Sequence, residues 1–143
     1  MIETVSHCNR IMAILVRNSY HNTGITFFTP DEFSQQLAYI NHPAGHVIAP
    51  HVHNPVHREV FYTEEVLVIK SGKLRVDFYH DDHSYIESRI LDQGDVILLA
   101  AGGHGFEMLE ASEVIEIKQG PYAGEADKTR FQPVEPEKLK VLE

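Results

Sequence analysis

Four side chains of the sequence have the types and spacing of metal ligands: His51, His53, Glu65 and His104. His51 and His53 are two residues apart, and on a β-strand such residues project from one face about 6.6 Å apart along the strand. Two imidazoles placed in this way can bind the same ion, and histidine is the commonest metal ligand. Glu65 and His104 are the candidates that complete the set from other parts of the chain.

Glu65 opens an apolar run in which Leu67 and Ile69 share its face. A carboxylate in phase with buried aliphatic side chains is costly unless a positive group meets it. His104 has glycine on both sides, and glycine lets the backbone approach a site closely. We therefore expect both side chains to point into the cavity that holds the ion.

Three imidazoles and one carboxylate form a donor set of borderline softness, which accepts iron, manganese, nickel, copper or zinc. The predicted cofactor is one divalent transition metal of unassigned identity. Replacing His51, His53 or His104 with Ala should sharply lower the amount of bound metal, whereas His80→Ala should not.

The segment between His53 and Glu65 contains rival donors, since His57 or Glu59 could take the place of Glu65. Glu65 is the better candidate because it keeps the strand phase. His57 and Glu59 are instead our candidates for a catalytic base near the metal.

These donors must be positioned by short β-strands, because runs rich in Val, Ile, Phe and Tyr recur between Gly, Pro, Asn and Asp residues. The predicted strands are residues 11–16, 24–28, 36–40, 46–53, 65–71, 73–80, 84–91, 95–99, 105–109 and 114–119. Two short helices are predicted in residues 30–37 and 136–142. Many short strands joined by short turns favour an all-β sandwich or closed barrel.

Two motifs of the sequence resemble those of the cupin superfamily. Gly45, His51, His53, Glu65 and Gly72 follow the first motif, and Gly94-Asp95 with His104 is similar to the second. Eleven residues separate His53 from Glu65 where the family has three or four, and the second motif lacks its proline and its trailing asparagine. The resemblance implies a cupin-type double-stranded β-helix, or jelly-roll, barrel with the metal near its mouth, as in small single-domain metal-binding cupins of unassigned function.

The length of 143 residues fits a single domain, residues 1–143. We expect the core barrel at about residues 24–120 and a C-terminal tail at 121–143 that packs on the barrel or on a partner subunit. Barrels of this kind often pair to cover open edges, so a homodimer is expected.

The net charge of -9 argues against a nucleic-acid partner. The single cysteine, Cys8, excludes an intrachain disulfide framework and fits a reducing compartment. No apolar run reaches the length of a membrane span. We expect a cytoplasmic protein with a small-molecule ligand or substrate, and no nucleic-acid or membrane partner.

Function is expected mostly by analogy with the family. The first hypothesis is an isomerase or epimerase acting on a small polar carbohydrate-related substrate, because a bound metal can act as a Lewis acid beside a carbonyl group. The alternatives are an iron-dependent dioxygenase and a non-catalytic protein that binds or senses a small ligand.

Overall fold

The computed structural model describes all 143 residues and shows an all-β protein, as predicted. The strands are β1 (Ile2–His7), β2 (Arg10–Val16), β3 (Gly24–Phe27), β4 (Ala38–Asn41), β5 (Glu65–Ser71), β6 (Lys73–Tyr79), β7 (Tyr85–Asp92), β8 (Val96–Leu99), β9 (Gly103–Met108), β10 (Glu113–Lys118) and β11 (Val141–Leu142). Two short 3-10 turns, η1 (Gly124–Asp127) and η2 (Pro136–Lys138), lie near the C-terminus.

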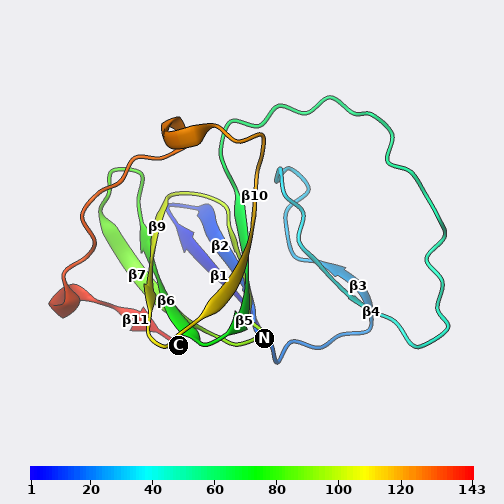
Figure 1. Ribbon diagram of the computed structural model, residues 1–143, viewed down its shortest axis with the longest axis horizontal. Helices are drawn as coiled ribbons and strands as arrows, with labels where there is room; N and C mark the ends of the chain where they lie inside the picture. Colours follow the sequence, from blue (N-terminus) through cyan, green and yellow to red (C-terminus); the bar gives the residue numbers. More distant parts are fainter.

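Two sheets face each other and enclose the core (Figure 1). One sheet has the strand order β1-β2-β8-β5-β10, and the other has the order β11-β7-β6-β9. Alternate residues of each strand point inward, so Leu67 and Ile69 from β5 join Leu74 and Val76 from β6 in one buried cluster. The core also takes Val5 from β1, so the folded body begins earlier than the expected residue 24.

Arg17 joins the N-terminal hairpin to the rest of the sandwich. Its guanidinium donates hydrogen bonds to the Glu3 carboxylate, to the Ile90 carbonyl at 2.6 Å and to the Asp95 carboxylate at 2.9 Å. Asp95 also accepts the backbone N–H of Asn18 and of Asp92. The Gly94-Asp95 pair therefore has a structural role, because it holds the turn between β7 and β8.

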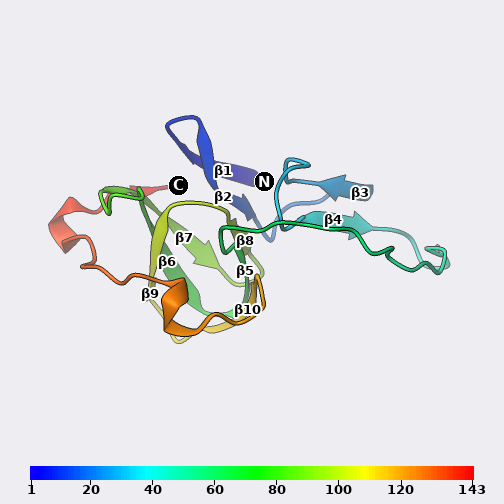
Figure 2. The ribbon, with the colours of Figure 1, turned by 90° about the horizontal axis from the view of Figure 1, so that it is seen from above.

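The prediction of a strand at residues 46–53 is wrong for the single chain. Residues 42–62, here called the arm, contain neither strand nor helix and run outward from the two sheets before returning to β5 (Figures 1 and 2). A strand exists only where a neighbour completes its hydrogen bonds, and the only backbone hydrogen bond within the arm joins His46 N to Pro43 O at 3.2 Å.

The two sheets do not close into a barrel. β9 pairs only with β6, and β10 pairs only with β5, so each ends its sheet with a free edge. The open side of the sandwich formed by β9, β10 and their connection, residues 103–118, is here called the seam. A closed barrel would need further strands at this seam.

β3 and β4 form a separate two-stranded hairpin at the base of the arm (Figure 2). The helix predicted in residues 30–37 is absent, because the Gln36 side chain donates to the carbonyl oxygens of Pro30 and Phe33 and holds a compact turn instead. Phe33 and Leu37 from this turn pack on the outer face of the larger sheet.

The tail, residues 121–143, packs along the smaller sheet of its own chain. Phe131 packs edge-on against Tyr79 with ring centroids 5.0 Å apart, and the Val134 N–H donates to the Tyr79 hydroxyl at 2.9 Å. Of the helix predicted in residues 136–142, only the turn η2 forms, and β11 then pairs in parallel with β7. The structure contains no apolar helix of membrane-spanning length.

Candidate functional site

Glu65 and His104 meet across the gap between the two sheets. The His104 Nε2 atom lies 3.1 Å from Glu65 Oε2, and Glu65 is only 7% exposed. The hydrogen bond with His104 is the largest influence on the Glu65 pKa and lowers it, against the opposing effect of burial. Lys118 and Lys128 add to this lowering through their charge. Glu65 is therefore held as a carboxylate, which accepts hydrogen bonds or binds a cation.

Strand register and close packing fix both side chains. Glu65 is the first residue of β5 and lies beside Lys118 of β10, while His104 lies opposite Phe78 of β6. Gly102, which precedes β9, has φ +73°, and a Cβ atom there would lie 2.7 Å from the Tyr79 carbonyl oxygen. This approach of β9 to β6 therefore requires glycine at position 102.

The pair lines a cavity of about 870 Å³ that opens at the seam. Its walls come from β5, β6, β9 and β10, from the end of the arm and from residues 127–131 of the tail. Basic and acidic side chains both face it, among them Arg75, Glu107 and Lys128. A cavity of this size with mixed charges fits a small polar molecule better than an apolar one.

Arg75 is held in the wall of the cavity by two carboxylates and is not free to bind a ligand. Its guanidinium donates to Asp77 at 2.7 Å and forms an ion pair with Glu107 at 2.7 Å. Glu116 is different, because it faces the same cavity from β10 and makes neither an ion pair nor a side-chain hydrogen bond. Glu116 is thus the free carboxylate of the cavity.

The structure brings together two of the four predicted metal ligands. Glu65 and His104 are in contact, whereas His51 and His53 lie on the exposed arm, where their ring centroids are 5.2 Å apart. His57 and Glu59 are also exposed on the arm and do not line the cavity. Carboxylate and imidazole fit a transition metal chemically. Within one chain, however, the four donors do not converge on one ion.

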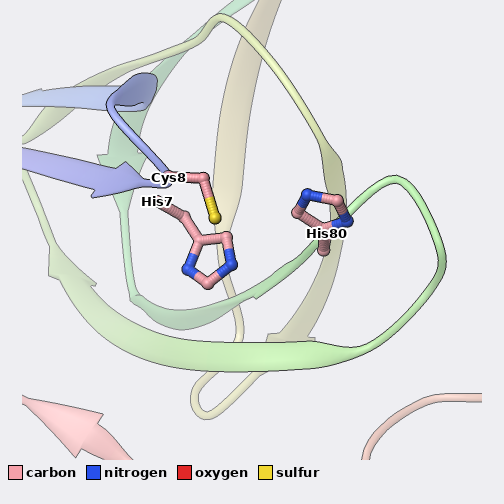
Figure 3. A group of neighbouring side chains, drawn as sticks. All are labelled: His7, Cys8 and His80. Atoms are coloured by element: carbon pink, nitrogen blue, oxygen red, sulfur yellow. The ribbon is translucent and has the colours of Figure 1, made fainter.

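A second group of side chains with metal-ligand donor atoms lies at the tip of the β1–β2 hairpin (Figure 3). The donor atoms of His7, Cys8 and His80 all lie within 4.8 Å of one another. Cys8 and Asn9 form the turn with φ of 50° and 59°, a conformation that is uncommon for residues other than glycine. A thiol and two imidazoles suit zinc or copper, so His80→Ala is not a neutral control for metal binding.

Sequence reasoning missed the grouping of His7 and Cys8 with His80, because only the folded sheets bring these distant positions together. It also missed Tyr79, whose hydroxyl and ring join the cavity wall to the tail. No known protein family, curated protein or solved structure matches the chain.

Proposed function

We propose that the protein is an enzyme of the isomerase or epimerase type that acts on a small polar, carbohydrate-related molecule, with Glu65 and His104 at its reactive centre. The observation that carries this proposal is the buried, ionised Glu65 in contact with His104 at the wall of a polar cavity. A carboxylate and an imidazole in contact are donors suited to a transition metal, and Glu116 of the same cavity is a free carboxylate for moving a proton.

Glu116, the free carboxylate of the cavity, would remove a proton from the carbon next to a substrate carbonyl. The same carboxyl group would then return the proton to the neighbouring carbon. Glu65 and His104 would hold the metal, because an imidazole that binds a metal has no free ring lone pair with which to take a proton.

A divalent transition metal is part of the proposal, with Glu65 and His104 as two of its ligands and His51 and His53 as the others. When bound, such an ion supplies Lewis acidity toward a carbonyl oxygen. The resemblance to cupins supports this donor set, and a jelly-roll barrel completed at the seam would bring the four residues together.

Elemental analysis of the purified protein tests the metal centre. We expect bound transition metal in the wild type and at least a tenfold loss of metal in His104→Ala, because one of the two donors already in contact is removed. His21→Ala is the matched control, since His21 is exposed and lies outside both the cavity and the Cys8 group. Metal that persists in His104→Ala but disappears in Cys8→Ser would assign the ion to the hairpin tip and contradict the proposal.

Exchange of substrate C–H hydrogens in D2O tests the reaction class. Proton transfer beside a carbonyl should introduce deuterium into a keto or aldo sugar, as followed by proton NMR, and Glu116→Gln should slow product formation. Oxygen consumption without such exchange would favour the dioxygenase instead. A tightly bound small molecule recovered unchanged would favour a binding or sensing protein.

A further inference from the structure

Most of the exposed apolar side chains of the protein are concentrated in three places. Of 19 large hydrophobic residues that are exposed, seven lie on the arm, three on the β3–β4 hairpin and five at the seam. Clustered apolar surface of this extent marks a binding surface, whereas single exposed hydrophobic residues do not. The arm, the hairpin and the seam therefore each need an apolar partner.

At the seam, side chains that point into the sandwich are left uncovered. Phe106 and Met108 lie opposite the fully buried Val76 and Leu74, yet they are 40% and 55% exposed. The cause is the free edge of β9, because no strand lies beyond it. A strand added to this edge would use its free N–H and C=O groups and cover both side chains.

The arm has the properties of such a strand without its partner. Val47, Ile48 and Val52 are exposed, and residues 46–53 make no backbone hydrogen bond to another strand. Pro43 and Pro55 flank this stretch and favour an extended chain. Pro50 within it has no N–H, so its nitrogen must face away from β9, as on an edge strand. The arm and the edge of β9 therefore both have backbone N–H and C=O groups without a partner, and these groups can pair with each other.

One face of the β3–β4 hairpin likewise lacks a surface to pack on. Ile25 lies directly opposite Ile40, and both are exposed together with Phe27 on the same face. A two-stranded hairpin is marginally stable in water unless its apolar face is covered. The hairpin and the arm are consecutive in the chain, so one partner can cover both.

We propose that the protein forms a strand-exchanged dimer. In a two-fold symmetric pair, each chain lays residues 46–53 against the free edge of β9 in the other copy. His51 and His53 of one chain thereby join Glu65 and His104 of the other, and each site is built from two chains. This inference rests on the proposed function for the metal, but the exchange itself rests on the uncovered surfaces.

A second copy fits as the partner because the arm leads away from the seam of its own chain (Figures 1 and 2). Residues 42–58 contain no acidic residue, while the chain has a net charge of -9, so the arm adds no negative charge where it would meet the second copy. The residues between His53 and Glu65 can span about 40 Å when extended, enough to reach a neighbouring subunit. Two-fold exchange covers both arms and both seams at once and leaves no open end for further association.

At the base of the arm, one buried polar atom has no hydrogen-bond partner. Gln35 Oε1 is a buried side-chain oxygen without a hydrogen-bond partner. The same residue donates its backbone N–H to the carboxylate of Glu64, where the arm returns to the body. Buried polar atoms without a partner are rare. A hydrogen-bond donor of the second chain, passing this point, can pair with Gln35 Oε1.

The mass of the protein in solution tests the exchange without reference to metal. Light scattering after size exclusion should give twice 16.3 kDa for the wild type. A variant with residues 46–57 replaced by a Gly-Ser linker of equal length should give a single chain, with circular dichroism and a cooperative melt to show that the body is folded. A monomeric wild type, or a folded linker variant that remains dimeric, would overturn the exchange.

A mixed dimer tests whether the site is shared. One chain carries His51→Ala and His53→Ala, the other carries His104→Ala, and two different affinity tags isolate the mixed dimer after co-expression. Exchange predicts one intact site and therefore half the metal of the wild-type dimer, while each variant alone binds almost none. A mixed dimer without metal, beside a wild type that binds it, would show that each site is built from one chain.

The failures of the two proposals are distinguishable. A wild type that binds no metal contradicts the metal centre, and the mass of the linker variant then decides the exchange alone. A monomeric wild type that does bind metal contradicts the exchange and leaves the proposed function intact.

Discussion

Tyr79 illustrates how a single buried side chain connects the cavity to the tail. Burial is the main influence on its pKa and raises it, while the hydrogen bond from Val134 acts in the opposite direction. A raised pKa in the folded state means that folding favours the neutral phenol. Its stabilising effect is therefore present below the ordinary tyrosine pKa of about 10 and is lost as the pH rises through the folded value.

We expect Tyr79 to ionise after the other five of the six tyrosines when absorbance at 295 nm is followed against pH. Tyr79→Phe should remove this last step and lower the free energy of unfolding by about 1 kcal/mol, because the Val134 N–H loses its acceptor. Tyr122→Phe is the control, since Tyr122 is exposed. If Tyr122→Phe removed the last step instead, the assignment to Tyr79 would be wrong.

Arg17 shows the difference between a buried and an exposed ion pair. Its partners Glu3 and Asp95 are largely buried, so Arg17→Ala leaves Asp95 without its cation and Glu3 with only the 3.3 Å ion pair to Arg89. We expect this change to lower the free energy of unfolding by about 2–4 kcal/mol in urea titration. The matched variant Arg10→Ala removes an exposed pair with Asp81 and should cost less than about 0.5 kcal/mol. Equal losses in the two variants would contradict this role of Arg17.

At the level of elements, the sequence pattern located most of the strands, and it predicted β5 at the bounds that the structure shows. Strands such as β6 carry alternating inward residues that sequence alone reveals. β1 was missed because its polar residues, including Glu3 and Ser6, hide the alternation. The arm has β-forming residues, but whether they form a strand depends on a partner edge that local sequence does not describe.

The candidate site could likewise be predicted only in part from the sequence. Glu65 and His104 were predicted from strand phase and flanking glycines, and their contact follows from the register of β5 and β9. The placement of His51 and His53 depends on where the arm docks, which is a tertiary property. The group of His7 with His80 depends on the packing of two distant turns, so no local pattern indicates it.

For the whole molecule, the exchange makes a prediction about proteolysis. Arg58 lies on the arm and is the only Lys or Arg between Arg17 and Lys70. In an exchanged dimer the arm is docked, so trypsin should cleave after Arg58 slowly at high protein concentration and faster on dilution below the dissociation constant. Mass spectrometry of the two fragments measures the rate. Cleavage that does not depend on concentration would contradict a docked arm.

The packing of the tail also bears on how this fold can diversify. Residues 127–131 contribute part of the cavity wall but belong to no strand, and they are held mainly by contacts around Tyr79 and Phe131. Connecting segments tolerate substitution better than the strands they join. Substitution of this short stretch could therefore change which ligand the proposed site selects, while the sheets that align Glu65 with His104 stay unchanged.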